Sequence, residues 1–217
     1  MKKHNIIIGF LFFLIGGVVL SSCVKENNGQ TIALIGTEYY IKDILSVIPD
    51  SLVGEFDSVF GNIPEGAIPP KIEGTYVMHE RQRVYTNIPY NWPLSLVESD
   101  VLLHFEGQHN GTVSLDLTDD TQNLTDRVYV MGSGNAFTAY VIEKKEYDMP
   151  IGDNTFHVKI KRGIVMAGVI EDAGIRNLRY ASIIINADDN SNGEIEQYPP
   201  GSFFIYKDRD GLSERIR

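Results

Sequence analysis

Hydrophobic and polar residues alternate along much of the chain from residue 71 onward, and this alternation predicts β-strands. In residues 101–106, and again in 113–118, every second position is Val, Leu or Phe. Between these segments, Gln108-His109-Asn110-Gly111 ends in the Asn-Gly pair that favours a tight hairpin turn. Similar patterns predict turns at 132–135 and 162–163. Further strands are expected at 73–80, 127–131, 136–142, 155–161, 164–170, 178–186 and 202–207.

Eight or nine strands of this kind, joined mostly as sequence-adjacent hairpins, indicate a mainly β domain over residues 71–217 with an antiparallel meander. Closing such a sheet removes its exposed edges, and eight strands make a small barrel. We therefore expect a small closed barrel. The alternative is an open β-sandwich.

A helical period precedes the β region. Within residues 37–61, apolar side chains recur every three to four positions in two sets, one on each side of Pro49. Asp50 or Ser51, with Glu55, supplies the start of the second helix. Two short helices are expected, and each is too short to be stable without docking on an apolar surface. The prolines from Pro64 to Pro70 end this segment, so residues 37–70 form the helical part with its connector.

Residues 1–22 have the features of a secretory signal. They begin with Met1-Lys2-Lys3 and continue with an apolar run that is short for a helix spanning ~30 Å of hydrocarbon. Cys23, the single cysteine, directly follows Leu20-Ser21-Ser22. This stretch resembles the lipobox of bacterial lipoproteins. The resemblance implies removal of residues 1–22 and lipidation of Cys23, with the polar residues 23–36 as a flexible tether. The alternative is a membrane anchor with an incidental thiol.

The charge balance limits the partners that we expect. Removing residues 1–22 takes away Lys2 and Lys3, which leaves 17 basic side chains against 29 acidic ones. Nucleic acid and anionic lipid headgroups would repel such a surface. Membrane contact is therefore expected through acyl chains on Cys23 alone. The expected location is the cell envelope, on the periplasmic or the surface face of an outer membrane.

The β region opens with Ile72-Glu73-Gly74-Thr75-Tyr76. A first strand with glycine, any residue and an aromatic resembles the start of lipocalin-like (calycin-like) domains. Uncharacterised lipoproteins of Gram-negative anaerobes are similar in layout, with a lipobox, a tether and a barrel-like β domain. The family pattern has tryptophan where this chain has Tyr76.

Candidate catalytic residues are few. His79 and His104 lie on separate predicted strands, without the local pairing of a metal-binding motif. There is no G-x-S-x-G nucleophile motif, and the single cysteine is assigned to lipidation. These observations weigh against an enzyme. An envelope hydrolase with a site assembled from separate strands, including His79 and His104, remains the alternative.

Three other stretches are candidate sites. Asp188, Asn190, Asn192 and Glu194 lie in a polar segment with the early spacing of a calcium loop, but Pro199 occupies the position of the final glutamate. The alternative interpretation of this segment is a polar turn without a metal ion. Tyr85, Tyr90 and Trp92 form an aromatic loop that could contact a ligand or close one end of the barrel. Ser51 and Ser58 each follow an aspartate and resemble acceptors for O-glycosylation in exported bacterial proteins.

Together these features predict a lipid-anchored binding or accessory module of the cell envelope. The expected partner is a small apolar molecule, a glycan or another envelope protein. No cofactor is expected beyond the candidate calcium ion.

Overall fold

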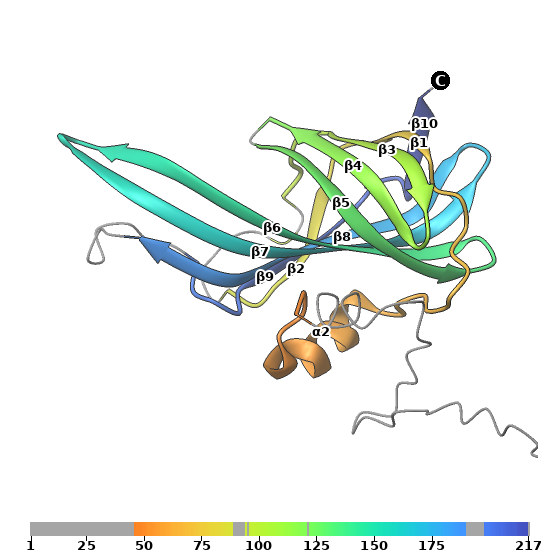
Figure 1. The fold of residues 1–217 in the computed structure, drawn as a ribbon, viewed down its shortest axis with the longest axis horizontal. Helices are drawn as coiled ribbons and strands as arrows, with labels where there is room; N and C mark the ends of the chain where they lie inside the picture. The colour runs from red at the N-terminus through yellow and green to blue at the C-terminus, as the bar shows by residue number, and fades with distance from the viewer. Residues whose placement is uncertain (1–45, 89–93, 95, 121, 190–197, 217) are drawn as a thin grey trace, which may run out of the picture. The chain divides into compact units, whose positions relative to one another are not determined.

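The computed structural model describes residues 46–88, 94, 96–120, 122–189 and 198–216. All the described residues belong to one compact unit. They form ten strands in a single antiparallel sheet, preceded by the 3₁₀ turn η1 (Asp50–Leu52) and the helix α2 (Val53–Phe60) (Figure 1). The strands are β1 (Gly74–Met78), β2 (Gln82–Thr86), β3 (Val101–His109), β4 (Thr112–Asp119), β5 (Gln122–Ser133), β6 (Ala136–Ile151), β7 (Asn154–Glu171), β8 (Gly174–Asp189), β9 (Phe203–Lys207) and β10 (Leu212–Ile216).

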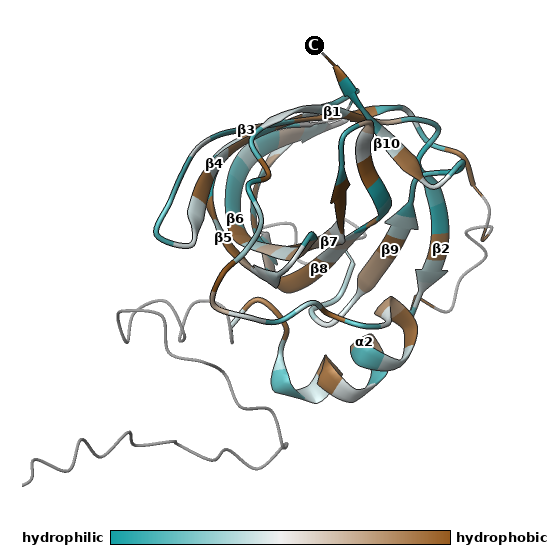
Figure 2. Ribbon diagram, turned by 90° about the vertical axis from the view of Figure 1, so that its right-hand side faces the viewer, coloured by the Kyte–Doolittle hydropathy of each residue, from teal (hydrophilic) through white to brown (hydrophobic). Residues whose placement is uncertain are grey.

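Eight of these strands close into a ring, seen in Figure 2. The closure depends on β8, which has two successive partners along one edge. Gly174–Arg176 pair with β10, whereas Arg179–Ile183 pair with β9. Because β10 also pairs with β1, the order β1-β3-β4-β5-β6-β7-β8-β10 returns to its start. The prediction of a mainly β, antiparallel chain is confirmed, and the single sheet differs from the two packed sheets of a sandwich.

The sheet has an apolar inner face and, over β6 to β9, an apolar outer face as well. Tyr76, Phe105 and Phe137 are fully buried inside the ring. The outer face is covered by α2, whose Phe56 and Phe60 stack with ring centroids 4.8 Å apart. Burying each of these two rings contributes about 1.5–3 kcal/mol, which holds a helix of eight residues that could not persist alone.

The second predicted helix is therefore confirmed, as η1 and α2. The first one falls almost entirely on residues 37–45, which lie outside the described part of the chain. No helix among the described residues is long and apolar enough to cross a membrane.

The prediction of a turn at 162–163 was wrong. β7 runs without interruption from Asn154 to Glu171, and the register against β8 shifts between Lys161 and Arg162. Gly163 is required for close packing: a Cβ there would lie 2.4 Å from the carbonyl oxygen of Val47. The predicted Asn-Gly hairpin is confirmed, since Asn110 and Gly111 have φ of 49° and 71°, as a tight hairpin turn requires.

Candidate functional site

A cleft of about 910 Å³ opens where the inner face of the sheet runs past the end of the ring. β5 pairs with β6 only as far as Tyr140, so β6 continues to Ile151 with β7 as its one described partner. Figure 1 shows the β6–β7 hairpin extending away from the ring, with β8 beside it along most of its length. The inner face of this long hairpin forms one wall of the cleft, and β2 with residues 96–99 contributes the opposite wall.

Inner-face side chains change character at the cleft. On β6, Val141 is buried inside the ring, and the next inward residue is Glu143. On β7, Ile164 lies in the core, and the next inward residue along the strand is Arg162. Arg162 and Glu143 are cross-strand partners joined by an ion pair of 2.5 Å. The inner face of β6 and β7 is thus apolar inside the ring and charged where it begins to line the cleft.

A second ion-pair network forms the β2 wall. Glu98 joins two arginines, with 2.7 Å between its Oε2 and Nη2 of Arg81 and 2.5 Å between its Oε1 and Nη2 of Arg83. Nη1 of Arg81 also lies 3.0 Å from Oδ2 of Asp119, whose side chain is completely buried. Both arginines are buried, Arg83 to 2% exposure. Such groups are stable in a protein interior only when paired.

Aromatic rings form the floor of the cleft. The guanidinium of Arg81 lies 4.8 Å from the centroid of Tyr206, and that of Arg83 lies 5.2 Å from the centroid of Phe204. Tyr198 meets Phe204 edge-on at 5.1 Å and remains 36% exposed at the opening. Burial, with the nearby charge of Glu98, raises the pKa of Tyr206 to about 12, so its phenol stays protonated.

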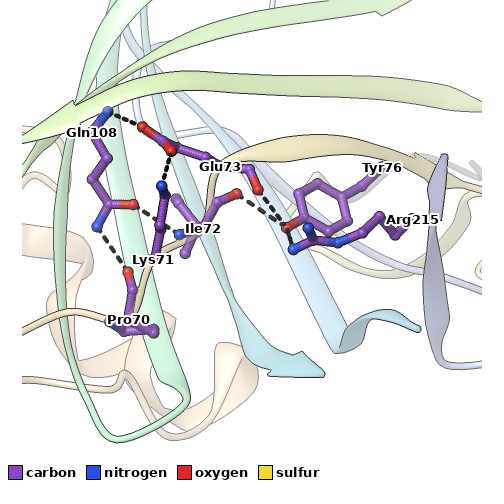
Figure 3. A network of polar contacts seen from close by, with 7 residues as sticks. All are labelled: Pro70, Lys71, Ile72, Glu73, Tyr76, Gln108 and Arg215. Atoms are coloured by element: carbon purple, nitrogen blue, oxygen red, sulfur yellow. Dashed lines mark hydrogen bonds and ion pairs between the residues drawn. The ribbon is translucent and has the colours of Figure 1, made fainter. Parts of the chain in front are cut away.

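A polar network, drawn in Figure 3, lies at the opposite end of the ring, where β1 begins and β3 and β10 end. The hydroxyl of Tyr76, in the middle of β1, donates to the carbonyl of Ile72 at 3.1 Å and accepts from Nη2 of Arg215 at 2.6 Å. The guanidinium of Arg215 also lies 5.0 Å from the centroid of the Tyr76 ring. This contact joins β1 to β10, the strand that completes the ring.

Gln108 continues the network at the end of β3. Its side-chain amide donates to the carbonyl of Pro70 at 2.8 Å and accepts from the backbone N–H of Ile72 at 2.8 Å. Its own backbone N–H donates to Glu73, which forms an ion pair with Lys71 at 2.6 Å. These bonds fix the connector that enters β1, so polar groups here have structural partners.

The two candidate catalytic histidines lie outside the cleft. His104 is on β3, where it pairs with Thr75 of β1, and His79 directly follows the end of β1. Nδ1 of His79 lies 2.9 Å from Oδ2 of Asp100, and this hydrogen bond raises the pKa of the exposed imidazole. His104 contacts Thr75 Oγ1 at 2.8 Å on the outer face of the sheet. Among the described residues, neither His79 nor His104 is in the lining of the cleft or of the two smaller pockets.

Of the three aromatic candidates, only Tyr85 lies among the described residues. Tyr85 lies on β2, not in a loop as predicted, because β2 pairs with β9. Its ring stacks on Phe203 at 5.4 Å and its hydroxyl donates to Glu55 at 2.6 Å, so it helps to dock α2 on the outer face. Tyr90 and Trp92 lie outside the described residues, as does Cys23.

Asp188 lies at the end of β8 and is exposed, while Asn190, Asn192 and Glu194 fall outside the described residues. Within the described ranges, no group of three or more His, Cys, Asp or Glu side chains is arranged to hold a metal ion. Ser51 and Ser58 lie on η1 and α2, and the hydroxyl of Ser58 donates to the carbonyl of Glu55 at 2.7 Å.

Sequence reasoning missed the cleft residues, above all Arg81, Arg83, Glu98 and Arg162. One signal was present: on strands whose inward positions are apolar, the pattern is broken by a charge at Glu143 and at Arg162. Two charges of opposite sign at inward positions of neighbouring strands are the mark of a buried ion pair.

Comparison with known proteins gives no family for this chain: no protein-family model, no curated protein and no solved structure matches it.

Proposed function

We propose that this protein is a lipid-anchored binding module of the cell envelope. In this proposal Cys23 carries the acyl chains, residues 23–36 form the tether, and the β domain holds a ligand in the cleft between β2 and the β6–β7 hairpin. The eight-strand ring, entered through Gly74-x-Tyr76, supports assignment of the β domain as a lipocalin-like barrel.

One observation carries the binding function. The inner face of the sheet, which elsewhere is filled by close-packed apolar side chains, opens into a cleft of about 910 Å³ lined by aromatic rings and oriented charged groups. Pockets of roughly 300–1,000 Å³ with a few placed polar groups on an apolar floor are typical of small-ligand sites. The hydrolase alternative receives less support, because His79 and His104 lie outside this cleft.

Ligand binding is tested by native mass spectrometry of the protein purified from its own membranes. The expected spectrum contains a non-covalent small-molecule adduct. A double variant, Tyr147→Ala with Tyr198→Ala, removes two aromatic rings from the cleft lining and should lose the adduct. Leu102→Ala, on the outer face of β3 and 39% exposed, is the matched control and should keep it. An adduct-free wild-type protein overturns the proposal of a tightly held ligand.

Anchoring is tested separately by metabolic labelling with a fatty acid. The wild type should carry the label and sediment with membranes, whereas Cys23→Ser should lose the label and leave the membrane fraction. Membrane association and labelling that survive Cys23→Ser would overturn lipidation at this residue.

A further inference from the structure

We infer that the ligand of the cleft is a neutral oligosaccharide. This inference rests on the proposed binding function and specifies its ligand class. It depends on the way charges are paired in the cleft, on the exposed aromatic faces and on the size of the opening.

The charged groups of the cleft neutralise one another. Arg81 and Arg83 are paired with Glu98 and Asp119, and Arg162 is paired with Glu143. The two remaining charged side chains of the lining, Lys145 and Asp120, have opposite signs and are both exposed. A strongly anionic or cationic ligand would therefore meet no net opposite charge, and binding it through a buried arginine would mean breaking an ion pair in the interior.

The same ion pairs exclude a purely apolar ligand. A fatty chain laid against Arg162, Glu143 and Glu98 would remove these groups from water without offering them a hydrogen bond. A ligand that fits must place hydroxyl groups against the edges of paired guanidinium and carboxylate groups. Such groups have donor and acceptor positions left over after pairing, and they can bond neighbouring hydroxyls.

Aromatic faces at the opening supply the other half of the recognition. Tyr198 lies in the cleft lining with its ring edge-on to Phe204, and Tyr147 lies on the long hairpin opposite Val158, with Nζ of Lys145 5.7 Å from its ring centroid. The C–H face of a sugar ring is apolar and packs on such rings, while its hydroxyls point sideways toward polar groups. This combination of one apolar face and a polar rim matches a pyranose better than a lipid or a peptide.

The extent of the cleft points to more than one sugar ring. Its volume lies near the upper end of the range of roughly 300–1,000 Å³ for small-ligand pockets, and it runs from Arg83 on β2 to Tyr147 on β6. Tyr147 and Tyr198 both line this cleft, and in this inference they contact different units of one saccharide chain.

The test is isothermal titration calorimetry of residues 23–217, prepared without lipid as Cys23→Ser, against three sets of probes. These are neutral hexasaccharides of glucose, mannose and galactose, acidic oligogalacturonides, and stearic acid. We expect at least one neutral hexasaccharide to bind, with an affinity that changes less than twofold between 50 and 500 mM salt. Tyr198→Ala and Tyr147→Ala should each weaken it at least tenfold, Tyr198→Phe should retain it within threefold, and Leu102→Ala should match the unmodified protein.

The outcomes separate the two proposals. Binding of stearic acid or oligogalacturonide alone overturns the assignment to a neutral oligosaccharide and leaves the binding function standing. The same conclusion follows if the native mass spectrum contains a small-molecule adduct but no neutral hexasaccharide binds in calorimetry. No adduct together with no binding of any probe overturns both. Binding of a neutral hexasaccharide that is unaffected by Tyr198→Ala and Tyr147→Ala overturns the assignment to this cleft.

Discussion

The carboxylate of Glu98 provides the sharpest test of how the cleft is built. It joins Arg81 and Arg83 at 2.7 and 2.5 Å, and its side chain is 20% exposed, whereas the two arginine side chains are almost wholly buried. Glu98→Gln keeps the shape of the side chain and removes its charge. The matched control is Glu80→Gln, because Glu80 pairs with Arg209 at the same 2.5 Å while both side chains are 57% exposed.

The two substitutions differ in burial and in the number of arginines left without this partner, and burial sets the expected magnitude. Removing one partner of a buried ion pair costs about 3–5 kcal/mol, since an uncompensated charge is left in the interior. Arg81 keeps its contact with Asp119, which places the Glu98→Gln loss near the lower end, at roughly 3 kcal/mol. The exposed pair at Glu80 is solvated and contributes about 0–1 kcal/mol.

Urea denaturation followed by far-ultraviolet circular dichroism measures both losses as free energies of unfolding. Equal slopes for wild type and variants would show that the comparison is between the same two states. The reasoning is refuted if Glu98→Gln lies within about 1 kcal/mol of Glu80→Gln, because a network that costs no more to break than a solvated pair is not a buried one.

Four further changes test the packing described above. Phe56→Ala should lower the free energy of unfolding by about 3–5 kcal/mol in urea titrations, because its ring is fully buried beneath the sheet. Gly163→Ala should cost about 1–3 kcal/mol in the same assay, since the new Cβ would clash with the carbonyl of Val47. Tyr180→Phe should raise the unfolding free energy by about 1 kcal/mol, because the buried hydroxyl has no hydrogen-bond partner among the described residues. Burial raises the pKa of Asp208 from 3.8 to about 6, so the folded state holds this proton more tightly than the unfolded state. The resulting stability is present below pH 4 and is lost as pH rises through 6, and Asp208→Asn should reduce that fall by up to about 3 kcal/mol in urea titrations at stepped pH.

The ring could be predicted from sequence where each strand carries its own signal. Residues 101–118 alternate cleanly because one face packs inside the ring and the other meets water, and the Asn-Gly turn fixes their register. The second helix was readable for the same reason, with Phe56 and Phe60 one turn apart. In both cases the burial pattern repeats the local period of the backbone.

β2 shows why the cleft could not be found in this way. Its inward residue is Arg83, 2% exposed, while Val84 points outward and is 37% exposed, which inverts the rule that apolar residues face the core. The inversion is stable only because Glu98 and the rings of Phe204 and Tyr206 lie opposite, and these come from distant parts of the chain. A hydrophobicity pattern contains no information about such partners.

Strand length accounts for the position of the cleft. β6, β7 and β8 have 16, 18 and 16 residues, whereas β1 has 5 and β3 has 9. A ring can close only over the length that all its strands share, so the long strands must project beyond it. Beyond the ring, the inner face begins with the ion pair of Glu143 and Arg162, whose side chains are 8% and 18% exposed. Further along β7 it continues with Val158 and Phe156, which are 0% and 8% exposed. The apolar core of the ring therefore ends where the buried ion pair of Glu143 and Arg162 begins, and the cleft opens at this point.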